Sequence, residues 1–155
     1  MDINIELEAE KLYTNRLMQD NEQIALFEEA LERIEAERNV QHIPLLCRAF
    51  DDETEHYEVM YGMVHAVERY DKFSTPAQAT ATFISSIPAM LPQAAEWVET
   101  FLFGILNDDA ARQIFAEQLA ISPPNVQDQI RSLLRKIVAD DPEAFQTKVA
   151  EVSAF

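Results

Sequence analysis

The sequence predicts an all-α protein, a single domain over residues 1–155 made of about seven to nine antiparallel helices in a curved, HEAT-like or solenoid-like stack. Three observations predict this fold. Apolar residues recur at helical spacing along most of the chain, and no segment shows the apolar-polar alternation of a strand. The chain contains only two glycines but seven prolines, and the prolines stand where helices are expected to begin or end.

The apolar periodicity locates the helices in order. Apolar residues at intervals of three and four recur within 24–34, 60–67, 97–105 and 130–138. Connections of a few residues between such helices favour antiparallel neighbours. The first helix is expected to be short and looser than the others. The predicted helices span 3–18, 20–38, 43–50, 54–71, 75–90, 92–106, 108–120, 123–139 and 142–152.

Capping residues support several of these boundaries. Thr75, Ser122 and Asp141 each precede a proline, and a residue of this type caps a helix whose first position is the proline. Asn107 followed by Asp108 separates two periodic segments, as expected where one helix ends and the next begins. These residues predict four helix starts in the second half of the chain.

The charge of the chain disfavours several classes of ligand. Asp and Glu outnumber Lys and Arg by 28 to 12, which gives a net charge of −16. Such a chain repels phosphate backbones and anionic lipids, so we expect no direct binding to nucleic acid or membranes. The N-terminal residues lack the apolar region of a secretory signal, which predicts a cytoplasmic protein. Prolines interrupt the uncharged run 73–95, which is therefore expected to be a core segment rather than a membrane span.

Motifs for catalysis and for cofactors are missing from the sequence. Two glycines cannot form the glycine-rich loops that cradle phosphates. Cys47 is expected to be a small buried residue, because no His and Asn or Asp signature accompanies it. We therefore predict no enzymatic activity, no catalytic residues, no cofactor and no metal ion.

A metal site is the weakest alternative. Glu53 and His56 have the Glu-x-x-His spacing of di-iron helical bundles, but such centres need a second copy of the motif and this chain has none. His65 and Glu68 are one turn apart and can orient each other as a structural pair. A metal-binding helical protein would use these four residues.

The two glycines fall inside predicted helices. Glycine at such a position costs about 0.5–1 kcal/mol relative to alanine. We expect a second helix backbone to approach closely at Gly62 and at Gly104, which would offset that cost.

A dense acidic cluster lies where the helix 54–71 is expected to begin. Five carboxylates fall within eight residues: Asp51, Asp52, Glu53, Glu55 and Glu58. Like charges this close repel one another, and a basic partner relieves the repulsion, so we expect these side chains to be hydrated, unpaired and partner-binding. One of the two aspartates is also expected to cap the helix after Thr54. A second acidic run, within 1–38, is interpreted as a solvated helix face with ion pairs such as Glu29–Arg33.

Two segments of the chain resemble a known family: FDDETEHYEVMYGMVHAVERYD at 50–71 and IPAMLPQAAEWVETFLFGILND at 87–108, with a helical continuation to about Ala139. The Asp-Asp pair, the His-x-x-Glu motif, the Glu-Trp pair and Ile-Leu-Asn occur in the same order as in the immunity protein 30 family. That family is all-helical and is encoded beside polymorphic toxins of bacterial contact-dependent and related competition systems. The resemblance implies a cytoplasmic protein that neutralises a cognate toxin by direct contact and has no catalytic role.

Two functional hypotheses follow. In the first, an immunity protein binds the C-terminal domain of a cognate, basic toxin through the acidic cluster, because charge complementarity speeds association. In the second, the helical stack is a scaffold or adaptor unrelated to toxins. Gene context separates them, since an adjacent toxin gene supports immunity and an isolated housekeeping gene supports the adaptor.

Overall fold

The computed structural model describes residues 3–153, and every regular element in that range is a helix. Nine α-helices and two short 3-10 helices follow one another within these residues. Residues 1–2 and 154–155 of the expected domain 1–155 lie outside the described part. The elements are α1 (Ile5–Thr14), α2 (Asn21–Ala36), η1 (Val40–His42), α3 (Ile43–Cys47), α4 (Tyr57–Glu68), η2 (Arg69–Phe73), α5 (Pro76–Met90), α6 (Ala95–Leu106), α7 (Asp109–Ala120), α8 (Pro124–Asp140) and α9 (Pro142–Val152).

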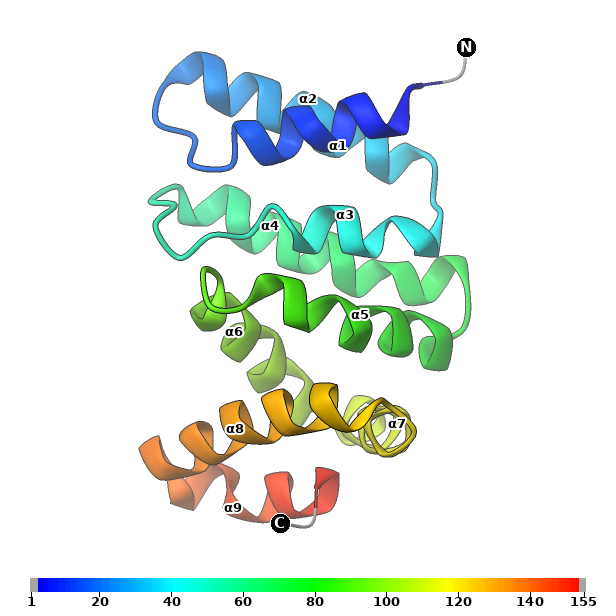
Figure 1. The fold of residues 1–155 in the computed structure, drawn as a ribbon, viewed down its shortest axis with the longest axis vertical. Coiled ribbons are helices and arrows are strands. Elements are labelled where there is room, and N and C mark those ends of the chain that lie inside the picture. The colour runs from blue at the N-terminus through cyan, green and yellow to red at the C-terminus, as the bar shows by residue number, and fades with distance from the viewer. Residues whose placement is uncertain (1–2, 154–155) are drawn as a thin grey trace.

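The helices stack in the order of the sequence along the long axis of the molecule (Figure 1). Along the stack, α1, α3, α5, α7 and α9 each pack against the next. Helix α2 packs on α4, and α8 packs on α5, α6 and α9, whereas the described residues of α4 and α6 approach each other less closely. The all-α fold and the solenoid-like stack predicted from the sequence are confirmed.

Helix α5 lies in the middle of the hydrophobic core. It packs against α3, α7 and α8, and its residues Phe83, Ile84 and Ile87 are buried. Phe83 and Phe101 pack with ring centroids 4.6 Å apart, and Phe101 meets Phe50 at 5.4 Å. The expectation that the uncharged run 73–95 is a core segment is therefore confirmed. Within residues 3–153 no helix has the length and apolarity needed to cross a membrane.

Local capping explains most helix starts. The side chains of Thr75, Asp108 and Asp141 each accept a hydrogen bond from the backbone N–H of the third residue after the cap. The three distances are 3.1, 2.9 and 3.2 Å, respectively. These three predicted caps are confirmed. The prediction for Ser122 is wrong, because α8 begins at Pro124 after Pro123, and the Ser122 hydroxyl instead donates to the carbonyl of Gln118.

The largest departure from the predicted boundaries separates α3 from α4. The predicted helix 43–50 ends at Cys47 and the predicted helix 54–71 begins only at Tyr57, so residues 48–56 form an α3–α4 loop. Three side chains of this loop, those of Ala49, Phe50 and Thr54, are completely buried. The acidic cluster therefore lies mainly on a loop that is packed onto the core.

The expectation about the glycines is wrong at both positions. A Cβ at Gly62 would meet no atom within 4 Å, and a Cβ at Gly104 would meet only a side-chain atom, Oε2 of Glu68, at 3.4 Å. No helix backbone approaches either residue that closely. Gly62 has no packing reason in the described structure, whereas Gly104 borders the cleft described below.

Candidate functional site

Asp51 is a structural residue of the α3–α4 loop. Its side chain is almost completely buried, and its Oδ2 accepts a hydrogen bond from Nε of Arg16 at 3.1 Å. Its Oδ1 accepts from the backbone N–H of Glu53 at 2.9 Å, and the neighbouring Thr54 hydroxyl donates to the carbonyl of Arg16 at 2.9 Å. The expectation that Asp51 is hydrated and unpaired is therefore wrong.

Asp52 fastens the same loop to the start of α6. Its Oδ2 accepts a hydrogen bond from the backbone N–H of Glu96 at 3.2 Å, and its own N–H donates to the carbonyl of Gln93 at 2.8 Å. Burial raises the pKa of the Asp52 carboxyl, because a charged carboxylate is poorly solvated there. An aspartate of the cluster does cap a helix, but the helix is α6. Helix α4 begins after His56 without a side-chain cap, so the predicted capping of that helix is wrong.

The three glutamates of the cluster differ from the two aspartates. Glu53, Glu55 and Glu58 are exposed, and their carboxylates make no hydrogen bond or ion pair with any residue in 3–153. They stand on a loop and a helix start that other residues hold in place. These three side chains are exposed and unpaired among the described residues, as expected, and their role in partner binding stays a prediction.

Two tyrosines on the first turns of α4 extend the exposed region. Tyr57 is 58% exposed and Tyr61, one turn later, is 50% exposed. Their rings lie 6.5 and 5.1 Å from the ring of Trp97 on α6, which is buried. Tyrosine is enriched in protein interfaces because one rigid side chain offers apolar area and a hydroxyl. We call Glu53, Glu55, Tyr57, Glu58 and Tyr61 the tyrosine-glutamate surface.

No motif in the sequence marks these two tyrosines as binding residues. The available signal is their spacing, since Tyr57 and Tyr61 are four residues apart and both lie outside the apolar stripe of Met60, Val64 and Val67. The buried state of Trp97 agrees with the general expectation that an aromatic stripe at helical spacing packs in the core.

The central helices lack the cations that would neutralise this surface. No lysine or arginine occurs between Arg48 and Arg69 or between Lys72 and Arg112, so α4, α5 and α6 contain none. Unpaired carboxylates on these helices keep an uncompensated negative potential, which attracts basic partners.

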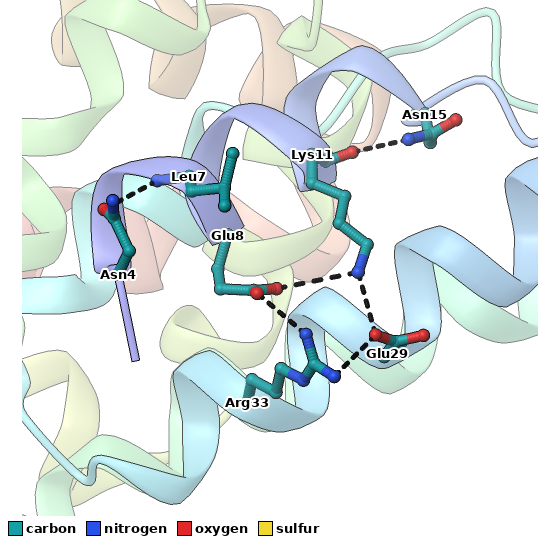
Figure 2. Close-up of polar contacts among 7 residues, drawn as sticks. All are labelled: Asn4, Leu7, Glu8, Lys11, Asn15, Glu29 and Arg33. Atoms are coloured by element: carbon teal, nitrogen blue, oxygen red, sulfur yellow. Dashed lines mark hydrogen bonds and ion pairs between the residues drawn. The ribbon is translucent and has the colours of Figure 1, made fainter. Parts of the chain in front are cut away.

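The acidic run of α1 and α2 is different, because it carries its own cations. Glu8 accepts from Nη1 of Arg33 at 2.9 Å, and Glu29 pairs with Nζ of Lys11 at 2.9 Å and with Nη2 of Arg33 at 2.8 Å (Figure 2). The hydrogen bond from Lys11, followed by the charge of Arg33, lowers the pKa of Glu29. The predicted Glu29–Arg33 pair is confirmed. This network stabilises the contact of α1 with α2.

Comparison with known families gives one match. The sequence model described as immunity protein 30 matches residues 14–115, which is more than half of the chain. The chain belongs to the immunity protein 30 family. No curated protein and no solved structure matches it significantly.

The matched range of this immunity protein contains the whole tyrosine-glutamate surface. It runs from the end of α1 into α7, so it begins earlier than the resembling segments 50–71 and 87–108 and ends before the helical continuation to about Ala139. Helices α8 and α9 lie beyond it. Membership of this family implies a protein that binds a toxin partner, and immunity proteins are generally not enzymes.

The residues of the metal alternative do not come together. Nδ1 of His65 lies 3.0 Å from Oε1 of Glu68 on α4, which is the structural pair expected from their spacing. Glu53 and His56 lie on the loop before that helix. Within residues 3–153 no group of three or more His, Cys, Asp or Glu side chains is placed to hold a metal ion.

Proposed function

We propose that this immunity protein neutralises a cognate bacterial toxin by direct contact through the tyrosine-glutamate surface. The proposal rests on one observation above all. Three exposed glutamates, which have no partner within residues 3–153, share one short stretch of chain with two half-exposed tyrosines whose rings contact the buried Trp97. Aromatic anchors of this kind supply most of the affinity of protein-binding sites.

The charge pattern supports a basic toxin domain as the partner. A net charge of −16 and the absence of lysine and arginine from α4, α5 and α6 favour a cationic surface and disfavour nucleic acid as a direct ligand. Electrostatic steering raises the association rate constant toward about 10⁸–10⁹ M⁻¹s⁻¹ at low salt. The toxin is then inactivated because its active site is covered or a movement that it requires is blocked. Neutralisation of this kind takes place in the cytoplasm.

The association rate with the toxin encoded by the adjacent gene tests this proposal. We expect the combined substitution of Glu53, Glu55 and Glu58 by Gln to slow association and to flatten its dependence on ionic strength in stopped-flow measurements. The matched control replaces Glu6, Glu28 and Glu143 by Gln, because these exposed glutamates of α1, α2 and α9 give the same change in net charge on other helices.

The outcomes separate the alternatives. Slower association for the first variant, with near-unchanged association for the control, supports steering through the tyrosine-glutamate surface. Equal effects of both variants, or an association rate that does not depend on salt, would overturn the steering role. If the protein pulls down no toxin and its gene has no toxin gene beside it, the adaptor hypothesis is favoured instead.

A further inference from the structure

A cleft of about 360 Å³ opens between α4 and α6. Tyr61 lies against Trp97 and Glu68 lies near Gly104, so the two helices run in the same direction. The rings of Tyr57 and Tyr61 meet the ring of Trp97 between the first halves of these helices. The cleft occupies the space between their C-terminal ends, above α5 and beside the start of α7.

The cleft has an apolar floor that a glycine leaves open. Phe83 and Phe101 are buried at the floor, and Ile114 of α7 lines one wall. Gly104 is exposed on α6, and any side chain at this position would project toward Glu68 and into the cleft. The exposed glycine of α6 therefore keeps the cleft accessible.

The rim of the cleft is acidic. Glu68, Asp71 and Asp108 line it together with the apolar residues, and none of the lining residues is basic. Among the described residues Glu68 has only His65 as an ionic partner, Asp71 has none, and Asp108 accepts the capping hydrogen bond of α7. An apolar floor below three carboxylates is complementary to a side chain with an apolar stem and a cationic end.

We propose that this cleft receives one arginine or lysine side chain of the toxin, as a second contact next to the tyrosine-glutamate surface. Long cationic side chains bury their methylene groups on apolar surface while the charged end remains at a polar rim. The two sites share helix α4 and both lie within the family match. The inference rests on the proposed function, because the toxin supplies the side chain.

Filling the cleft tests the inference with the toxin encoded by the adjacent gene. We expect Gly104→Leu to weaken binding by at least about tenfold, mainly through faster dissociation, while Gly104→Ala has a smaller effect. The matched control is Ala150→Leu, an exposed position on α9 outside the family match. Circular dichroism and thermal unfolding are used to check that each variant is folded.

A small probe tests the cleft without the toxin and without filling it. We expect n-butylguanidinium to shift the NMR signals of Gly104, Ile105 and Ile114, and the uncharged n-butylurea to shift them less. Asp71→Asn, which changes charge but hardly shape, should reduce the difference between the two probes. If n-butylurea binds as well as n-butylguanidinium, or if neither probe binds, the proposed chemistry of the cleft is wrong.

The outcomes also distinguish this inference from the proposed function. Toxin binding that is unchanged by Gly104→Leu removes the cleft contact and leaves neutralisation intact. Failure of the unaltered protein to bind the toxin removes the proposed function and the cleft contact together.

Discussion

Oδ2 of Asp52 and the backbone N–H of Glu96 form a hydrogen bond of 3.2 Å that joins the α3–α4 loop to the first turn of α6. The cap residue of α6 itself, Ala94, has no side chain that could accept this bond. A loop aspartate therefore supplies, from a distant part of the sequence, the acceptor that a helix start normally obtains from its own cap residue.

This bond predicts opposite results for two substitutions of Asp52. Asp52→Ala removes the acceptor and should lower the free energy of unfolding by about 0.5–2 kcal/mol. Asp52→Asn keeps an acceptor and removes a charge that burial disfavours, so we expect no loss of stability at neutral pH. Urea denaturation of the two variants measures this difference. Equal destabilisation by Asn and Ala would show that the carboxylate charge itself is required.

The raised pKa of Asp52 also predicts a pH dependence. The folded-state pKa lies above the ordinary value of 3.8, so the folded protein binds the proton more tightly than the unfolded chain. The stabilisation from protonated Asp52 is complete below that ordinary value and is lost as the pH rises through the folded-state pKa. The stability of Asp52→Asn relative to the unaltered protein should therefore increase over this window, as measured by urea denaturation from about pH 3 to about pH 7. A difference that stays constant would contradict the raised pKa.

The partly buried pair of Arg16 and Asp51 predicts a clear contrast inside the acidic cluster. Asp51→Asn leaves the Arg16 guanidinium without its carboxylate and should lower the free energy of unfolding by about 1.5–3 kcal/mol. Glu53→Gln replaces an exposed carboxylate that has no partner among the described residues. This substitution should change the free energy of unfolding by less than about 0.5 kcal/mol. Thermal and urea unfolding measure both. Similar effects of the two substitutions would mean that the ion pair contributes nothing to stability.

Tyr57 is expected to act in binding rather than in folding. Tyr57→Ala should weaken toxin binding by about 1–2 kcal/mol and leave the free energy of unfolding nearly unchanged, because the ring is 58% exposed. Ile121→Ala is the control, since Ile121 is 78% exposed and lies outside the family match. Calorimetric titration gives the affinities. A similar loss for both variants, or none for Tyr57→Ala, would remove Tyr57 from the interface.

The single cysteine is predicted to be inert in the folded protein. Burial raises the pKa of the Cys47 thiol to about 12, so the reactive thiolate is scarce at neutral pH. We expect a thiol reagent such as DTNB to leave the native protein unlabelled and to label it rapidly in urea. Fast labelling of the native protein would point to an accessible thiol and would revive a chemical role for Cys47.

Gly62 predicts a stabilising substitution. Because a Cβ at this position meets nothing within 4 Å, Gly62→Ala should raise the free energy of unfolding by about 0.5–1 kcal/mol. Gly104→Ala should gain less, since its Cβ would contact Glu68 at 3.4 Å. Thermal unfolding compares the two. A loss of stability for Gly62→Ala would indicate a packing constraint on α4 that the described structure does not show.

The sequence predicts those features that depend on neighbouring residues. Helical periodicity gives the order of the helices, and the caps at Thr75, Asp108 and Asp141 depend on residues three positions away. The roles of Asp51 and Asp52 depend on partners 35 and 44 residues away, which no local pattern reveals. For the same reason the sequence did not predict the cleft, since it results from the spacing of α4 and α6 over α5.

The bonds of Asp51, Asp52 and Thr54 fix the α3–α4 loop before any partner arrives. Glu53, Glu55 and Glu58 are thus presented in a set geometry, and docking does not have to order the chain that carries them. Because the side chains at these three positions contribute no bonds to that geometry, they can be exchanged for others at little thermodynamic expense, while their backbone bonds are kept. Because different residues hold the loop and face the partner, one scaffold could recognise different toxins through changes at the exposed positions alone.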